Sequence, residues 1–478
     1  MILPRRPLLC ACMLVSVLCP AQPDFLRQAT AVAPATPDPA IARALGSIDP
    51  ARIEQTIEAL VEFGTRNALT SMETGLAPGQ GVEAAADWIE AEFKQISAQC
   101  NGCLEVNRDA FVADPSSGSR WARRVPRPTR MTNIYAILRG ADPAQARRLV
   151  LVTGHYDSIN SNVFKSWSDT SGAAPGANDD ASGVAVSLEC ARVLSKLQFP
   201  ASIVFVAVDG EEEGLIGSAH LAHLAREQGW QLEAVLNNDI VGGNTTPGDT
   251  LQDKSAVRVF SEGIAATATP TEIHQLESLG YESDSPSREL ARTVLEVAST
   301  YAPAPFHPVL ELRRDRFLRG GDHTSFNEAG FPAVRFTEWR EDFHHQHQDV
   351  RIEGGIQYGD LIQYVDFDYV AHVALVNAAT LATLASAPPP PTHVRIVTAA
   401  LDNATTLQWD AAAHGQYEIV WRETRTSGWQ RALAVTPEAG TARVSVPVSK
   451  DNVIFGVRAL DAAGHRSAAV VPWPDSGR

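Results

Sequence analysis

Apolar residues follow two alternating patterns through most of the chain. Apolar positions three and four residues apart predict helices from Ile41 onward, including Ile53 to Val61, and again over Glu83–Ile96 and Gly183–Leu197. Continuous Val, Ile and Leu runs predict buried strands at Asn133–Leu138, Leu149–Thr153, Ser202–Val208, Val235–Leu236 and Ala333–Thr337. This alternation predicts an α/β fold, with a mostly parallel or mixed sheet sandwiched by helices. We assign it to a large domain over residues 41–386.

The pattern changes after Pro388–Pro391, which predict a stiff linker over residues 387–392. Beyond it, short alternating strands are expected at Val394–Val397, Thr405–Trp409, Gln416–Arg422 and Asn452–Leu460. Residues 393–478 are therefore predicted to form a small all-β sandwich. The segments Leu407–Trp409, Tyr417–Trp421 and Phe455–Ala459 resemble a fibronectin type III module. We expect a spacer, with binding to a surface or a carbohydrate as the alternative.

The N-terminus has the pattern of an export signal. Arg5 and Arg6 precede the apolar stretch Leu8–Leu18, which is followed by a small-residue cleavage site near Ala21. Residues 1–21 are therefore predicted to be a signal peptide, and the mature protein to be secreted or periplasmic. The apolar stretch is too short for a permanent membrane span. The Pro- and Ala-rich residues 22–40 are expected to form a loose leader.

Charge and cysteine content narrow the function classes. The chain has 478 residues and a formal charge of −16, which argues against nucleic-acid binding because phosphate contacts need basic surfaces.

Cleavage of the predicted signal peptide would leave three of the six cysteines. Cys100 and Cys103 are expected to form a local disulfide in an oxidising compartment, with a redox or zinc motif as the alternative. Cys190 is expected to be a buried free thiol.

Five polar segments carry side chains that can bind metal ions, and most follow apolar strands. They are Gly154–Asp157, Asn178–Asp180, Glu211–Glu212, Asn238–Asp239 and His344–Asp349. In open α/β sheets such segments gather beyond the carboxyl ends of the strands. Imidazole and oxygen ligands without thiolates suit zinc, or cobalt or manganese in its place. Because carboxylates at this density repel one another unless cations lie among them, the set predicts a two-metal hydrolase site.

The order and spacing of these motifs resemble family twenty-eight of the metallopeptidases, which are secreted bacterial aminopeptidases with two zinc ions. The resemblance covers most of residues 41–386. It implies that Glu211 is the general base and that Asp157 supports His155 from behind. It also implies a cis peptide between Asp179 and Asp180. The implied zinc ligands are His155, Asp179 as the bridge, Glu212, Asp239 and His345, with His347 as the alternative to the last.

The resemblance implies hydrolysis of peptides that have a free N-terminus. A carboxypeptidase or a glutaminyl cyclase on the same scaffold is the alternative, and a non-catalytic binding protein is a further one. A carboxypeptidase needs a basic pocket, for which the sequence offers Arg313, Arg314, Arg316 and Arg319, although a solvated charge run also explains them.

Asp322 and His323 either shape the cleft or pack a loop. We assign no site to His220 and His223.

Overall fold

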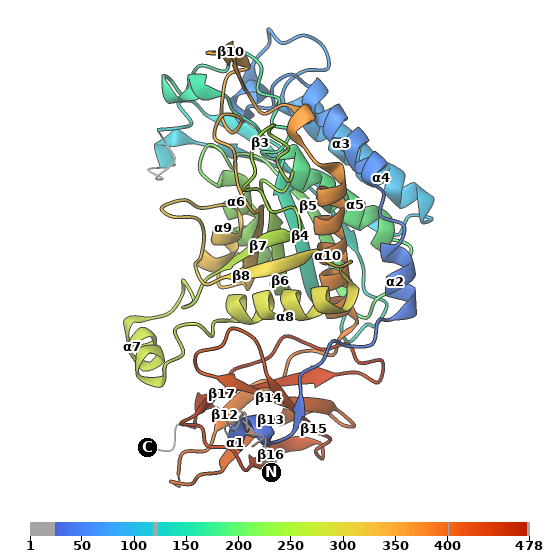
Figure 1. Cartoon of the computed structure of the whole chain (residues 1–478). Coiled ribbons are helices and arrows are strands. Elements are labelled where there is room, and N and C mark those ends of the chain that lie inside the picture. Colours follow the sequence, from blue (N-terminus) through green and yellow to red (C-terminus); the bar gives the residue numbers. More distant parts are fainter. Residues whose placement is uncertain (1–23, 118–122, 400, 476–478) are drawn as a thin grey trace, which may run out of the picture.

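Figure 1 shows the computed structural model, which describes residues 24–117, 123–399 and 401–475. The signal peptide predicted at residues 1–21 lies outside the described residues. The main body is built on a mixed eight-stranded sheet. Across the sheet the strands are β2 (Leu104–Ala113), β3 (Thr129–Leu138), β5 (Ser202–Val208), β4 (Arg148–His155), β6 (Gln231–Asn238), β9 (Ala333–Glu338), β7 (Ala256–Ser261) and β8 (His307–Glu311).

The four central strands, β5, β4, β6 and β9, run parallel to one another. At one edge β3 pairs antiparallel with β5, and β2 pairs antiparallel with β3. Near the other edge β7 pairs antiparallel with β9. Strand β4 is buried along its whole length, because helices cover both faces of the sheet. The predicted α/β fold and its five predicted strands are confirmed.

One face of the sheet carries the larger hydrophobic core. The helices that contribute to it are α2 (Pro39–Leu45), α3 (Pro50–Glu62), α4 (Val82–Gln99), α5 (Ala181–Leu194), α8 (Pro286–Tyr301) and α10 (Phe367–Ser386). The opposite face packs against α6 (Ile216–Glu227) and α9 (His323–Glu328). Helix α7 (Pro270–Leu279) projects from the body beside the C-terminal part (Figure 1).

Helix α10 is long and apolar enough to cross a membrane by length and composition, and it alone meets that test among the described residues. Its most apolar window is 83% buried inside the protein. Residues such as Val373 and Leu381 are fully buried in the larger core. The apolar composition of α10 is therefore accounted for by its place between the sheet and the neighbouring helices.

The C-terminal part contains two four-stranded sheets packed face to face. One has the order β1 (Thr30–Ala31), β15 (Arg431–Val435), β14 (Gln416–Glu423), β17 (Val453–Leu460). The other has the order β16 (Gly440–Val446), β13 (Thr405–Ala411), β12 (Thr392–Ile396), β18 (Trp473–Pro474). Trp409 and Trp421 are fully buried between the sheets. The small all-β sandwich is confirmed, whereas its kinship to fibronectin type III and the domain boundaries stay predictions.

The prediction of a loose leader over residues 22–40 is wrong for the described part of that segment. Short helix α1 (Asp24–Arg27) and strand β1 lie against the C-terminal sandwich, and β1 pairs antiparallel with β15. The ring of Phe25 packs on the sandwich core, and its carbonyl accepts a hydrogen bond of 2.9 Å from Trp421 Nε1. The Pro- and Ala-rich composition of residues 22–40 predicted a loose segment. Composition alone cannot show that β15 has a free edge with which this segment can pair.

Buried ion pairs join the sandwich to α8. Arg422 of the sandwich pairs with Asp284, which precedes α8, and Arg292 of α8 lies 3.2 Å from the same carboxylate. Arg458 of β17 pairs with Glu296 of α8 at 2.5 Å. The arginines and Asp284 are buried, and Glu296 is partly exposed. Each buried charge depends on its partner, so these pairs hold the two parts together.

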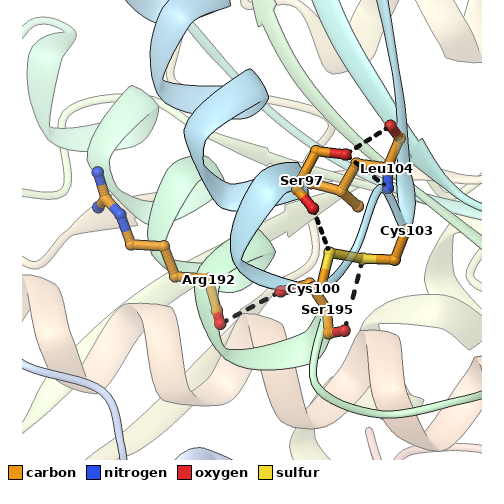
Figure 2. The surroundings of a disulfide bond; sticks show 6 residues. All are labelled: Ser97, Cys100, Cys103, Leu104, Arg192 and Ser195. Atoms are coloured by element: carbon orange, nitrogen blue, oxygen red, sulfur yellow. Dashed lines mark hydrogen bonds between the residues drawn. A yellow bond between two sulfur atoms is a disulfide. The ribbon is translucent and has the colours of Figure 1, made fainter.

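The predicted disulfide between Cys100 and Cys103 is present (Figure 2). It closes the short turn between α4 and β2. Beside it, Ser97 Oγ donates to the carbonyl of Leu104 at 2.9 Å and accepts from its N–H at 3.2 Å (Figure 2). The turn is therefore held by a covalent link and two hydrogen bonds. Cys190 is a buried free thiol, as predicted.

We predict that Phe25→Ala lowers the free energy of unfolding by about 1–2 kcal/mol, because it removes a half-buried ring from the sandwich core. Thermal or urea unfolding measures the change. Leu401→Ala is the matched control, because Leu401 is 96% exposed in the same sandwich. Equal losses in the two variants would show that the N-terminal segment does not stabilise the sandwich.

Candidate metal centre

The polar segments meet beyond the carboxyl ends of the central parallel strands. β4 ends at His155, β5 ends just before Asp209, and β6 ends just before Asp239. Asp179 comes from the loop that starts α5, and His347 comes from the loop after β9. Parallel strands thus bring residues from distant parts of the chain to one edge of the sheet, as expected.

The start of α5 lies unusually close to the strand ends. A Cβ added to Gly154 would lie 2.5 Å from the carbonyl carbon of Gly183, and one added to Gly183 would lie 2.2 Å from the carbonyl oxygen of Asn238. Only glycine permits this approach. It brings Asp179 and Asp180, just before the helix, next to His155. The peptide between these aspartates is cis, as the resemblance implied.

Two groups of donor atoms form around Asp179. His155 Nε2 lies 3.1 Å from Asp179 Oδ1, and Asp239 completes this group. His347 Nε2 lies 3.0 Å from Asp179 Oδ2 and 2.9 Å from Glu212 Oε1, which forms the second group. Within each group the donor atoms lie within 4.8 Å of one another. One carboxylate therefore faces two separate sets of ligands.

Asp157 is fully buried and orients its neighbours by hydrogen bonds. Its two carboxylate oxygens accept from the backbone N–H groups of Glu211, at 3.2 Å, and Glu212, at 3.0 Å. The Nδ1 atom of His155 lies 3.4 Å from the same carboxylate. Asp157 thus lies behind His155, where the sequence placed it, and also fixes the loop that carries both glutamates.

Asp180 and Asp360 position the site without joining the donor groups. Asp180 accepts from the backbone N–H of His155 at 3.0 Å and from that of Gly183 at 3.0 Å, so it ties β4 to α5. Asp360 accepts from the N–H of Asp179 at 2.7 Å. The sequence motif contained Asp180 but gave it no role. Asp360 had no signal, because it lies in a loop far along the chain.

Arg335 of β9 is the third residue whose role sequence reasoning missed. Its guanidinium is fully buried and lies 2.7 Å from Asp239 Oδ1. It also donates to the carbonyl of Gly320 at 2.9 Å. An arginine directly after the apolar start of a predicted buried strand was the available signal, because a buried charge needs a partner. Arg335 holds Asp239 and the loop that ends at Gly320 together.

The preference for His345 as the last ligand is not supported by the geometry. Its ring stacks on Tyr364 at a centroid distance of 3.8 Å, outside both donor groups. His347, the alternative, points at Asp179 and Glu212 instead. The direction of each ring follows from a turn in this segment, which has a left-handed φ of 56° at His347. His344 is half-exposed and lies against Asp342 at 2.9 Å.

Comparison with known proteins identifies the family. A model of "Peptidase family M28" matches residues 133–354. A probable zinc metalloprotease of Pyrenophora tritici-repentis is 42% identical over 449 residues, covering 92% of this chain and 88% of the relative. A probable zinc metalloprotease of Pyricularia oryzae is 43% identical, covering 92% and 85%. The chain belongs to peptidase family M28. These relatives are fungal, whereas the resemblance drew on bacterial enzymes.

Solved structures are similar at a lower level. LapB of Legionella pneumophila has a TM-score of 0.49 at 16% identity, covering 74% of this chain and 77% of that one. The LapA aminopeptidase of the same organism has a TM-score of 0.48 at 20% identity, covering 72% and 74%.

The donor atoms of this M28 peptidase fit zinc. Zinc bonds of about 2.0–2.1 Å in a tetrahedral arrangement place two ligand atoms about 3.3 Å apart. The separations of 2.9–3.1 Å between the histidine nitrogens and the carboxylate oxygens are close to that value. All the donors are nitrogen or oxygen, which zinc accepts.

The electrostatics of the site favour bound cations. Burial, together with the neighbouring Asp239, Glu212 and Asp322, raises the pKa of Glu211 well above its usual range. Burial and the Asp179 carboxylate also raise the pKa of Glu212. Carboxylates that resist ionisation in this way gain stability when divalent cations lie between them.

A cleft of about 850 Å³ opens beside the donor groups. Glu211, Glu212 and His347 line one end, and the loop from Arg313 to Gly320 lines much of the rest. The Nε2 atom of His323 lies 2.9 Å from the carbonyl oxygen of Arg314, so it holds this loop. Asp322 is fully buried near Glu211, and burial raises its pKa to about 7. His323 therefore packs against the loop that lines the cleft, and neither residue is among those that line it.

His220 and His223 lie outside the donor groups, as predicted. His220 stacks on Phe111 at 3.9 Å and lies 3.2 Å from Asp109 Oδ1. His223 is exposed beside Glu227. Their carboxylate partners come from β2 and from the same helix, outside the donor groups.

We predict that His347→Phe reduces zinc affinity at least about 100-fold, since a phenyl ring of similar size has no ligand atom. His345→Phe is the matched control, because it can keep the stacking on Tyr364, and we expect wild-type zinc content. Metal analysis after dialysis against buffered zinc checks both variants. Loss of zinc from the His345 variant alone would restore the assignment of His345.

Proposed function

We propose that the protein is an exported aminopeptidase that uses two zinc ions to hydrolyse the first peptide bond of its substrates. The proposed ligands are His155 and Asp239 for one ion, Glu212 and His347 for the other, with Asp179 between them. The observation that carries the proposal is the pair of donor groups that share Asp179 beside the Glu211 carboxylate. Cobalt or manganese could replace zinc, because the donors suit those ions as well.

Glu211 has the position that a general base requires. Its carboxylate lies within 4.8 Å of donor atoms of His155 and Glu212 and lines the cleft. Among the described residues no hydrogen bond holds this carboxylate, so it is free to accept a proton. When bound, zinc would polarise the scissile carbonyl and acidify water. Glu211 would take the proton of the attacking water and deliver it to the amine as the C–N bond breaks.

The shape of the site supports an exopeptidase. Asp239 is 2% exposed and is not among the residues that line the cleft, whereas Glu212 and His347 are, so we take the Asp239 side of the donor groups as the deep side. One end of the substrate peptide can lie against the closed, deep side of the donor groups. The rest of the peptide must then extend through the open cleft. We therefore propose that the N-terminus of the substrate lies on the deep side, near the Asp239 carboxylate that Arg335 holds.

The arginines considered for a carboxypeptidase are largely committed to other partners. Arg316 and Arg319 each pair with Glu341 at 2.9 Å, and Arg314 pairs with Glu328 at 3.2 Å. This favours the aminopeptidase over a carboxypeptidase. A glutaminyl cyclase would cyclise an N-terminal glutamine instead of consuming water, and substrate tests separate the two.

Export and the sandwich remain part of the proposal. The disulfide between Cys100 and Cys103 supports an oxidising, secreted or periplasmic location. We propose that the sandwich, with its fibronectin type III-like segments, is a stabilising spacer, because buried ion pairs fix it to α8. Binding of a surface or carbohydrate is the alternative.

We predict that Glu211→Gln keeps its zinc but loses turnover by about two to four powers of ten, the usual contribution of a general base. Steady-state kinetics and metal analysis on the same preparation provide the test. Glu227→Gln is a suitable control because Glu227 is exposed on α6, away from the donor groups. Near-wild-type turnover in the Glu211 variant would remove Glu211 from this role.

We also predict that aminoacyl-arylamides with a free amine are cleaved, that their N-acetylated forms are not, and that a chelator abolishes cleavage reversibly. Release of the arylamine is followed with and without added zinc. Cleavage of the blocked forms would contradict an aminopeptidase. Conversion of an N-terminal glutamine peptide to its cyclic form, with no arylamide cleavage, would support the cyclase instead.

A further inference from the structure

Five arginines lie around the cleft of a protein whose formal charge is −16. Four belong to the loop from Arg313 to Arg319, and the fifth is Arg124 from the segment before β3. Four carboxylates also line the cleft, so its arginines and carboxylates nearly balance, whereas the whole molecule has a large net negative charge.

Three of these arginines are neutralised within the protein. Arg316 lies between Asp315, at 3.1 Å, and Glu341, at 2.9 Å. Arg319 shares Glu341, and Arg314 pairs with Glu328. Their charges hold the loop in place and are only partly available to a ligand.

Arg124 and Arg313 have no carboxylate partner among the described residues. Arg124 is exposed, donates to the carbonyl oxygen of Glu212 at 3.0 Å and lies over the ring of Trp167 at 5.1 Å. Arg313 is exposed and lies over the ring of Phe317 at 5.4 Å. Stacking orients each guanidinium and leaves N–H groups free to donate. Both arginines are therefore able to bind an external carboxylate.

The direction of the substrate decides which carboxylate they meet. If the N-terminal amine occupies the deep side beside Asp239, the residues after the scissile bond leave through the cleft. The volume of about 850 Å³ is within the range of sites for small ligands, so it can hold a short peptide segment. Side chains and the C-terminus of that segment come near the two free guanidinium groups.

We propose that Arg124 and Arg313 bind a carboxylate on the leaving-group side of the scissile bond, and that the enzyme therefore prefers short or acidic peptides. This inference rests on the proposed aminopeptidase function. The carboxylate can be an acidic side chain or the free C-terminus of a short peptide. Both present the planar pair of oxygens that a guanidinium binds by two hydrogen bonds.

The test uses two pairs of peptides that share N-terminal leucine. Leu-Asp-Ala-amide against Leu-Asn-Ala-amide tests an acidic side chain, and Leu-Ala-Ala against Leu-Ala-Ala-amide tests a free C-terminus. In each pair the ratio of kcat/KM, acid over neutral, is measured on the full-length zinc enzyme. We expect a ratio of about five in one or both pairs, because exposed ion pairs contribute only modestly. The pair that shows it identifies the source of the carboxylate.

The variants Arg124→Gln and Arg313→Gln should each lower that ratio, and the double variant should bring it to about one. A loss of structure would lower kcat/KM for both members of a pair and leave the ratio unchanged. Arg139→Gln is the matched control, because Arg139 is an exposed arginine that directly follows β3. It lies near the amino ends of the central parallel strands, away from the cleft. The ratio should stay at its wild-type value in this variant.

A ratio of one in the wild-type enzyme, or a preference that persists in the double variant, would overturn the inference. Either result leaves the aminopeptidase proposal intact, because the neutral peptides are still cleaved. Failure to cleave any of the four free-amine peptides would instead count against the proposed function itself.

Discussion

The close approach of α5 to the ends of β4 and β6 is the constraint on which the metal centre depends. It requires Gly154 and Gly183, because a Cβ at either position would overlap the neighbouring backbone. The fully buried carboxylate of Asp180 then bridges the two elements by accepting from His155 and Gly183. Without this contact Asp179 could not lie between His155 and His347. Packing of backbone against backbone thus decides the positions of the charged groups.

Charge balance is the second requirement of the site. The carboxylates around Asp179 are buried, and buried charges are tolerated only with partners. The protein supplies one partner in Arg335, which pairs with Asp239. Backbone N–H groups supply others, for Asp157 and Asp360. The remaining negative charge suits divalent cations, which is consistent with membership of family M28 and with relatives named as probable zinc metalloproteases.

The C-terminal sandwich and the N-terminal segment form one assembly with the peptidase body. β1 completes a sheet of the sandwich, and the chain then continues to α2, which packs in the core of the main body. Buried ion pairs at α8 fix the sandwich from the other side. The two ends of the described chain therefore meet in one small module, and this connection restrains the body that carries the metal centre.

The sequence by itself determined the α/β alternation, the central strands and the polar segments at their carboxyl ends, because these follow from local patterns of burial and from residue chemistry. It also placed Cys100 close enough to Cys103 for a disulfide. Tertiary structure alone decided that His347 and not His345 faces Asp179, since a left-handed turn sets the direction of each ring. It alone brought Asp360 to Asp179 and paired Thr30 with Ala432, because contacts between distant residues depend on how the whole chain packs.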